Sequence, residues 1–580
     1  MTWVLAVLAG TAVSPLLAVF LSVCFGRLYG WTAWLCLGAG FLAGVLSLKK
    51  TRPALLTNQG KRISDTEWIV SAIFLAVSLK LCLRLVFKVN NDWDVPLSSY
   101  FGDVPFHINI IRYLASGVKF WPEDPAYAGA GLSYHVGLDL FNSLLLLSGA
   151  ELIHGLIWVA LLGSLATGIM LFRWGRGFTV AGFLFNGGFL GFFSVKEAMS
   201  YNFNWHLVWK NIFLTLFINQ RSFLFAFPAG LLLLCQWRER FLRKKWKEGN
   251  SLFPFGVEAL LYFSLPLFHM HTFIFLSCVL LFWFVCFRET RACILKLWGI
   301  SLLPAGATIL LLTDFLKSGS MIHLHPGWEQ NGQPFLKFWL MNFGIFLPLV
   351  ILLLTKLVFF RKKEKLLNPK TAFVFPACLL FVLFSNLMLS TWNWDNIKLL
   401  VWSYLILLPY IWEELLCFRQ DPWRLQLFSR IAASTLLFFT GFIAVFGALF
   451  FRPYQGSKIA DLSELRQVES AVKNLPADAR FAAWNTHLHP LLLLGRKTAL
   501  GGVSHGVTHG YPAYERKSLL SRLMMGDPDW RQIAKGLGID YVYWGPLEKT
   551  NYPKSRKPWA DQVRRVYSGR FCDIYDLRSL

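Results

Sequence analysis

Apolar runs separated by short polar segments fill the chain up to about residue 451. Most runs are close to the ~20 residues that a helix needs to cross a bilayer core, and we expect about eleven to fourteen of them to do so. No basic residues precede the first run, so we interpret it as a retained span and not as a cleaved signal peptide. The apolar segments lie near 2–24, 31–48, 66–87, 136–150, 153–172, 178–195, 211–236, 256–268, 272–287, 294–313, 336–360, 371–390, 397–417 and 428–451.

The composition supports a membrane protein, because only 16% of the residues are charged, against about 25% in soluble domains. The net charge of +24 would also suit a nucleic-acid-binding protein. The basic residues, however, cluster in short loops between apolar runs, which is the distribution of cytoplasmic loops. We therefore predict no nucleic-acid partner, and we place in the cytoplasm the loops that carry Lys49, Lys50, Arg52, Lys61 and Arg62, then Arg238, Arg240, Arg243, Lys244, Lys245 and Lys247, then Arg361, Lys362, Lys363 and Lys365.

The polar loop at 88–134 then faces the other side of the membrane, as does the tail from residue 452. The loops of a polytopic chain alternate between the two sides of the membrane. Between residues 135 and 210 this alternation is consistent with the assigned sides only if one segment is re-entrant or interfacial, and 136–150 is our candidate. We predict two domains: a multi-pass transmembrane domain over 1–451, which contains the 88–134 loop, and an extracytoplasmic domain over 452–580.

The tail has the pattern of a small α/β domain. Residues 479–484, 539–544 and 571–576 are expected to form strands, and 529–537 a helix with Asp529 at its N-cap. The chain contains no Walker-type loop and no GxGxxG fingerprint, so nucleotide binding is not indicated. Nine of the ten cysteines lie in or beside apolar segments, and their spacing suggests neither a disulfide framework nor a zinc site.

The 88–134 loop contains GDVPFHINIIRYLASG, whose apolar residues recur at helical spacing. Pro105 suits the first turn of a helix, and Asp103 and His107, four residues apart, share one face. A carboxylate at a helix N-terminus stays ionised easily and can accept a proton from an incoming hydroxyl. The alternative is that Asp103 is a capping residue and His107 is solvated.

Asp92 and Asp94, in NNDWD, have the spacing at which two carboxylates hold a divalent cation such as Mg²⁺ or Mn²⁺. A solvated loop would show the same pattern, so they are weak candidates for a metal site. No other cofactor is indicated.

Aromatic residues with flat faces follow in FWPEDPAYAGAGLSYHVGLD. Trp121, Tyr127 and Tyr134 are candidates for stacking on sugar rings, or alternatively members of an interfacial aromatic belt. Tyr134 is followed by His135 and Asp139 at the outer end of the next apolar segment, and we expect all three to face the same site.

Charged and ionisable residues also recur at the outer edges of later segments. Such groups are retained near a membrane when they face a polar cavity or bind an anion, and arginine suits a phosphate by its bidentate geometry. The two histidines of HMH are alternatively metal ligands, and snorkelling explains each group taken alone. Their convergence on one face favours a substrate-binding role for Arg221, His269, His271, Trp394, Asp395 and Lys398.

Taken together, these motifs resemble those of the GT-C superfamily of integral-membrane glycosyltransferases. The similarity is scattered over about residues 90–575, and the loop lacks the adjacent Asp-Glu pair of the protein mannosyltransferase pattern. The segments similar to a bacterial group of such proteins are GDVPFHINIIRYLASG, FWPEDPAYAGAGLSYH, NQRSF, PLFHMH, WDNIK and YPAYERKSLLSRLMMGDPDWRQIAKGLGIDYVYWGPLE.

The resemblance implies an α-helical polytopic fold of GT-C type with a C-terminal soluble α/β domain, in a bacterial inner (plasma) membrane. It implies a glycosyltransferase (EC 2.4 class) that uses a polyprenyl-phosphate-linked sugar donor, with inversion at the anomeric carbon. The acceptor would be an extracytoplasmic glycan, lipid or protein, and the lipid of the donor would lie in a groove between spans.

The resemblance also implies roles for single residues. Asp103 would be the general base, with Asp94 as the second candidate, and His107 would orient the base or touch the phosphate. The leaving phosphate would be stabilised by Arg221, Lys398 and either His269 or His271.

Two other functions fit a polytopic chain. A transporter or flippase of a lipid-linked saccharide needs many spans too, but its polar groups usually lie at the midplane, whereas here they gather at one face. A non-catalytic membrane scaffold, whose tail binds a partner, is the other alternative.

Overall fold

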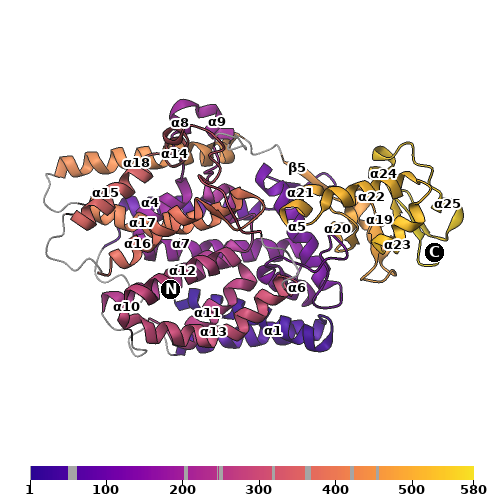
Figure 1. The fold of residues 1–580 in the computed structure, drawn as a ribbon, viewed down its shortest axis with the longest axis horizontal. Coiled ribbons are helices and arrows are strands. Elements are labelled where there is room, and N and C mark those ends of the chain that lie inside the picture. Colours follow the sequence, from indigo (N-terminus) through magenta and orange to yellow (C-terminus); the bar gives the residue numbers. More distant parts are fainter. Residues whose placement is uncertain are drawn as a thin grey trace.

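The computed structural model describes residues 2–49, 62–200, 207–243, 246, 252–315, 321–359, 368–417, 423–451 and 456–580. Helices that follow the apolar segments form a bundle, and a region with a five-stranded sheet stands at one end of its long axis (Figure 1). The expected fold class, α-helical and polytopic with a C-terminal α/β region, is confirmed. Most of the predicted cytoplasmic basic positions, at 50–61, 244–245, 247 and 361–365, lie outside the described residues.

Within the described residues, seven helices are long and apolar enough to cross a membrane, and a pair bent by 94° (α14 and α15) is an eighth candidate. This is fewer than the expected eleven to fourteen, because four apolar segments form helices of at most 17 residues. At 1.5 Å per residue such a helix spans about 26 Å or less, short of the ~30 Å bilayer core. The long helices are α1 (Thr2–Phe25), α2 (Gly30–Lys49), α4 (Asp65–Leu83), α7 (Leu152–Phe185), α13 (Arg291–Leu312), α17 (Ile397–Ile411) and α18 (Trp423–Phe446), and further helical turns extend the last three. The bent pair consists of α14 (Phe335–Phe343) and α15 (Phe346–Phe359). The shorter helices are α6 (Gly137–Leu147), α11 (Phe255–Phe268), α12 (Met270–Cys286) and α16 (Thr371–Phe384).

The segments predicted at 153–172 and 178–195 meet inside α7, where Gly175 and Arg176 leave the helical backbone conformation. The Arg176 guanidinium pairs with Glu67 of α4 at 2.6 Å, which ties the kink to the neighbouring helix. The remaining elements of the bundle are α8 (Leu190–Phe193), α9 (Val195–Ser200), η1 (Phe213–Phe217), α10 (Phe223–Leu242), η3 (Arg288–Thr290), β3 (His323–Leu324), β4 (Leu387–Met388), η4 (Asn393–Asn396), η5 (Trp412–Leu416) and η6 (Gly447–Phe451).

Small residues let α1 and α2 approach closely. A Cβ atom added to Gly40 would lie 2.6 Å from the carbonyl oxygen of Gly10, and one added to Gly44 would lie 2.7 Å from that of Ala6. Contacts of this kind at a G-x-x-x-G spacing are typical of helix pairs in membranes, where backbones must touch because lipid supplies no hydrophobic driving force between helices.

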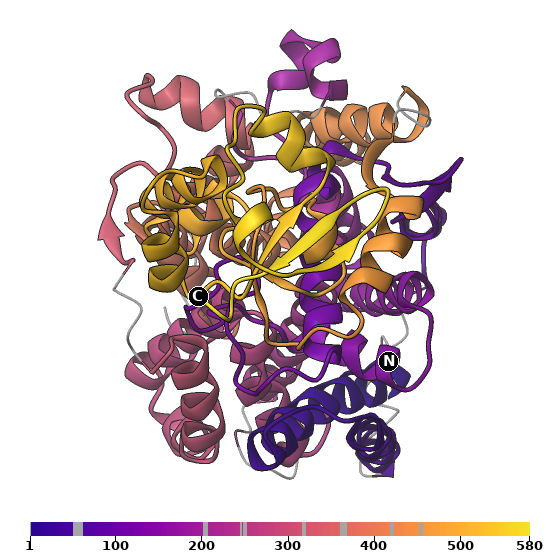
Figure 2. The ribbon, with the colours of Figure 1, turned by 90° about the vertical axis from the view of Figure 1, so that its right-hand side faces the viewer.

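The C-terminal region, which faces the viewer in Figure 2, contains a mixed sheet of strand order β7-β6-β8-β10-β9. The predicted strands are present as β6 (Arg480–Ala482), β8 (Tyr541–Trp544) and β10 (Asp573–Asp576). The predicted helix is α23 (Trp530–Leu537), but the side chain of Asp529 makes no capping hydrogen bond and pairs with Arg522 instead. The other elements are β7 (Lys497–Thr498), β9 (Arg565–Ser568), α19 (Leu462–Val472), α20 (Pro490–Leu493), α21 (Val503–Thr508), α22 (Ala513–Met525), α24 (Pro546–Asn551) and α25 (Trp559–Gln562).

Backbone pairing joins the polar loop to the C-terminal region. First, β2 (Asp92–Val95) pairs with β1 (Phe87–Val89) on one side and with β5 (Ser457–Asp461) on the other. Second, residues 125–128 follow the edge of the five-stranded sheet: the N–H of Thr498 donates to Pro125 (2.9 Å), and the N–H of Ala128 donates to Thr498 (3.2 Å). The loop is therefore built against the tail.

The helix predicted in the loop begins earlier than expected. It is α5 (Ser98–Ala115), so Pro105 lies inside the helix and Asp103 lies in its second turn, and neither stands at its N-terminus. An interior proline leaves the carbonyl four residues before it without its helical N–H donor. Here that carbonyl, of Phe101, lies 3.2 Å from Nε2 of His487 in the C-terminal region, and an imidazole N–H donor there compensates for the missing bond.

Candidate functional site

The bundle borders the C-terminal region around α5, α6 and α21 (Figure 1), and five separate segments carry ionisable and aromatic residues there. Ring contacts, hydrogen bonds and electrostatic contacts link them into one group. Nine of them were predicted from the sequence. We call the group the polar cluster; its members are Asp103, His107, Tyr134, His135, Asp139, His269, His271, Asp395, Lys398, His505 and His509.

Asp139 of α6 orients His107 of α5. Nδ1 of His107 lies 3.0 and 2.9 Å from the two carboxylate oxygens, and both side chains are only 2% exposed. A carboxylate only accepts hydrogen bonds, so His107 donates from Nδ1. Its Nε2 makes no hydrogen bond within the described part of the chain, which leaves this atom for a ligand.

Asp103 is half-buried and held by an amide. Nδ2 of Asn219 donates to Oδ2 of Asp103 at 2.5 Å and also to the carbonyl of Thr215 at 3.0 Å. Burial raises the pKa of Asp103 above its ordinary value, although the charges of His107 and Lys398 act in the opposite direction. The raised pKa makes Asp103 a stronger base than a solvated aspartate. The expectation that a helix N-terminus keeps Asp103 ionised is therefore wrong, because burial has the largest effect on the pKa of this residue.

Lys398 supplies a positive charge to the polar cluster. Lys398 lies at the start of α17, and its Nζ lies 2.9 Å from Oδ1 of Asp395, which comes three residues earlier in η4. The charge of Lys398 also reaches Asp103, His135 and His271. The Asp395–Lys398 pair therefore stands beside both the candidate base and the histidines.

His269 and His271 bring unpaired nitrogens to the polar cluster. Nδ1 of His269 accepts the backbone N–H of Thr272 at 3.2 Å, so its proton resides on Nε2. That Nε2 and both ring nitrogens of His271 are shielded from solvent and have no hydrogen-bond partner in the described residues. A buried polar group without a partner costs about 1–3 kcal/mol, so these three nitrogens are available to a ligand.

The C-terminal region contributes two histidines that the sequence did not suggest. His505 of α21 lies 3.5 Å from Asp124 of the loop, and its ring lies 4.1 Å from that of His509. Burial alone would raise the pKa of Asp124, but His505 and the N–H of Ala126 bring it below its ordinary value. The HxxxH spacing in GGVSHGVTHG was the available signal, hidden in a segment that lacks helical periodicity.

Arg221 and Trp394 are placed differently from the rest. Arg221 is 2% exposed and its Nη2 lies 3.3 Å from the carbonyl of Leu156 and 3.5 Å from Oδ1 of Asn142, against α7 and α6. Its Nε and Nη1 have no partner among the described residues, and its charge interacts with Asp139. Trp394 is buried and donates from Nε1 to the carbonyl of Val208 at 3.0 Å, which is a packing role.

The two carboxylates of NNDWD lie on β2, in the small sheet with β5. Asp92 pairs with Lys458 at 2.9 Å, while burial and the charge of Asp92 raise the pKa of Asp94. Within the described residues, no three His, Cys, Asp or Glu side chains stand close enough to hold a metal ion. A requirement for Mg²⁺ or Mn²⁺ stays a prediction, as does a role for Asp94.

Of the three aromatic candidates for stacking, only Tyr134 joins the polar cluster, where its ring lies 4.3 Å from that of His135. Tyr127 is 3% exposed, stacks on Tyr511 at 4.4 Å and lies 3.7 Å below the Arg516 guanidinium, so the expected sugar-stacking role is wrong for it. Trp121 donates from Nε1 to the carbonyl of Leu132 (2.9 Å) and braces the loop.

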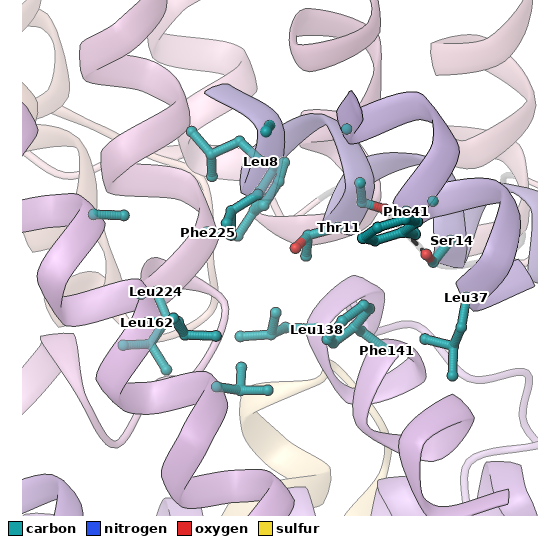
Figure 3. A pocket seen from close by; sticks show the side chains of 18 of the residues that line it. Leu8, Thr11, Ser14, Leu37, Phe41, Leu138, Phe141, Leu162, Leu224 and Phe225 are labelled. Atoms are coloured by element: carbon teal, nitrogen blue, oxygen red, sulfur yellow. Dashed lines mark hydrogen bonds between the residues drawn. The ribbon is translucent and has the colours of Figure 1, made fainter. Parts of the chain in front are cut away.

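An open apolar groove of about 500 Å³ lies beside the polar cluster, between α1, α2, α6, α7 and α10 (Figure 3). Its wall includes Leu138, the neighbour of Asp139, and Phe225, whose ring stacks at 3.8 Å on Phe268, the neighbour of His269. Leu224, in the same wall, comes three residues after Arg221 in the sequence. Helix α6 therefore presents Leu138 to the groove and Asp139 to the polar cluster.

No family model and no curated protein matches the chain. It is similar to the oligosaccharyltransferase of Archaeoglobus fulgidus. The likeness to that crystal structure, of the apo form, has a TM-score of 0.40 and 13% sequence identity, and it covers 83% of this chain and 69% of that one. A likeness of this size leaves the reaction to be argued from the residues.

Proposed function

We propose that this protein is a membrane glycosyltransferase that moves a sugar from a polyprenyl-phosphate-linked donor to an acceptor hydroxyl outside the cytoplasm. The observation that carries the proposal is the position of the polar cluster next to the apolar groove. An amphiphile with a long hydrocarbon tail and a charged, hydrogen-bonding head fits such a pair of sites. A polyprenyl-phosphate sugar is such a molecule.

The phosphate of the sugar donor would occupy the side of the polar cluster where hydrogen-bond donors of the protein have no partner. Nε2–H of His269 and the ring of His271 are shielded and unpaired among the described residues, and the charge of Lys398 acts on His271. Fixed donors of this kind stabilise charge as it develops on a leaving phosphate, without reorganisation at the moment of reaction. Arg221, whose charge interacts with Asp139, adds positive charge.

Asp103 would act as the general base. Its Oδ1 makes no hydrogen bond in the described residues, while Asn219 fixes Oδ2. Oδ1 takes the proton of the acceptor as the acceptor atom attacks C1 of the sugar. The bond from C1 to the phosphate oxygen breaks, and the electron pair leaves with polyprenyl phosphate. A single displacement of this kind inverts the anomeric carbon. His107, oriented by Asp139, would hold the acceptor or the phosphate through Nε2.

The remaining expectations belong to the same proposal. The protein would reside in a bacterial inner membrane with its C-terminal region on the outer side, next to the acceptor. The acidic loop and the polar cluster would then share that side.

The test is sugar transfer by purified full-length protein, with radiolabelled polyprenyl-phosphate sugars and an extract of the host envelope as acceptor. Asp103→Asn keeps size and removes the base, and we expect transfer to fall by roughly 10²–10⁴-fold. Asp561→Asn, an exposed carboxylate of α25, is the matched control and should transfer at the wild-type rate. Undiminished transfer by the Asp103 variant would remove the proposed base. If the folded wild-type protein moves labelled lipid across a vesicle membrane and transfers no sugar, the flippase is correct.

A further inference from the structure

His509 stands at the edge of the polar cluster and comes from the C-terminal region, outside the motifs that carry the family resemblance. It follows α21 directly, and its ring lies 5.9 Å from that of Tyr134 and 6.2 Å from that of Phe106. Its charge state is coupled to Asp395 and affects His135. His509 therefore faces residues of three bundle segments.

The backbone determines which ring nitrogen of His509 carries the proton. Nδ1 lies 2.9 Å from the carbonyl oxygen of His505. A carbonyl only accepts, so Nδ1 must be the protonated nitrogen, and in a neutral ring Nε2 then holds a lone pair. Nε2 makes no hydrogen bond in the described part of the chain, and the side chain is half-buried and not sealed.

The ring of His509 stays neutral at physiological pH. Burial, followed by the neighbouring His505, lowers its pKa to about 4. Tyr134 and Phe106 restrict the ring from the bundle side, and the carbonyl of His505 restricts it from its own helix. A neutral acceptor of fixed direction suits a hydroxyl donor and does not suit a phosphate, which has no proton to give.

We propose that Nε2 of His509 accepts a hydrogen bond from a sugar hydroxyl and so contributes to substrate recognition. The C-terminal region thereby supplies a binding residue to the site. The hydroxyl belongs either to the sugar of the donor or to a sugar of the acceptor. This inference deepens the proposed function and rests on it only for the identity of the substrate.

The first experiment needs no turnover. The full-length protein in nanodiscs is treated with diethyl pyrocarbonate at pH 6.5, and modified histidines are mapped by mass spectrometry. Neutral accessible imidazoles react, so we expect modification of His509. His489, fully buried with Nε2 near Glu548 and Nδ1 bonded to the N–H of Leu491, should not react. A short-chain polyprenyl-phosphate sugar, or a soluble glycan acceptor, should slow the modification of His509 severalfold. An unreactive His509, or one that no sugar protects, overturns the proposal even if transfer is observed.

The second experiment uses transfer kinetics to identify the hydroxyl. His509→Phe keeps an aromatic ring at this position and removes the hydrogen-bond acceptor Nε2. We expect the KM of one substrate to rise roughly 2- to 12-fold, which corresponds to the loss of one neutral hydrogen bond. His509→Gln, with an amide oxygen near the position of Nε2, should restore much of that loss. A rise in the KM of the donor assigns the hydroxyl to the donor sugar, and a rise in that of the acceptor assigns it to the acceptor. The deoxy form of that substrate should not distinguish His509→Phe from wild type. Unchanged KM values for both substrates overturn the proposal.

Discussion

The His107–Asp139 contact leads to the most quantitative prediction. Asp139→Asn keeps the shape of the side chain and removes its charge. The wild-type pair is shielded from water and has both carboxylate oxygens within 3.0 Å of Nδ1. A hydrogen bond to a charged group contributes about 1.5–3 kcal/mol. In the variant, one amide oxygen at most can accept from His107, and the ring loses the interaction that sets its tautomer.

If the hydrogen bond between His107 and Asp139 stabilises the transition state of sugar transfer, its loss lowers kcat/KM. At 1.4 kcal/mol per factor of ten, 1.5–3 kcal/mol corresponds to a fall in kcat/KM of roughly 10- to 140-fold. The assay is initial-rate transfer of labelled sugar by purified protein at several pH values. Thermal unfolding is measured in parallel, because Arg221 would also lose a nearby carboxylate.

Glu151→Gln is the matched control for Asp139→Asn. Glu151 also faces a histidine, His154, at 3.4 Å, but both side chains are exposed. Exposed pairs are worth about 0–1 kcal/mol, so transfer should fall by less than about fivefold. A folded Asp139→Asn protein that transfers within threefold of wild type would refute the role of the pair in orienting His107.

Three further predictions concern stability, the groove and pH. Glu548→Ala leaves buried donors of Trp484, Gly545 and His489 unpaired, and we expect a loss of about 3–5 kcal/mol of stability, visible as a lower unfolding temperature and faster proteolysis of the C-terminal region. Gly40→Leu should separate α1 from α2 and alter the groove, raising the KM of long-chain donors more than that of short-chain ones. The raised pKa of Asp103 means that its inactive protonated form persists to higher pH than in a solvated aspartate, so the transfer rate should rise with pH through that pKa and then level off.

Each of these predictions has its own contrary result. Glu515→Ala, at an exposed position of α22, should leave unfolding unchanged, and equal behaviour of Glu548→Ala would contradict the buried network. Gly38→Leu meets nothing within 4 Å and should not discriminate between chain lengths; if it does, the effect is not due to helix separation. A transfer rate that is constant from pH 4 to pH 8 would exclude Asp103 as the titrating base.

Much of the helical framework could be predicted, because an apolar run of helix length has few alternatives in or near a membrane. The kink of α7 fell between two predicted segments, and the three predicted strands are present. The start of α5 was misjudged, because Pro105 is a common first-turn residue and only the tertiary contact of His487 shows how it is tolerated inside the helix.

The composition of the polar cluster was harder to predict. Asp103 and Lys398 stood out because charges beside apolar runs are rare. Asn219 and His509 did not, because a neutral amide and a histidine in a glycine-rich segment look like ordinary loop residues. The pairing of β2 with β5 was also missed, since DWDV alternates over only four residues and SKIAD does not alternate at all. Contacts so distant in the sequence leave no local pattern.

The seating of the polar loop on the C-terminal sheet also has a consequence for biosynthesis. Glu123 in the loop pairs with Lys497, 374 residues later in the chain. At about 5–20 residues per second, a ribosome takes roughly 20–75 s to make that stretch. Throughout that time the early helices can already be inserted, while the loop lacks the strand edge that shapes it. The site therefore matures last, and a chain released before residue 497 yields an inserted but inactive protein.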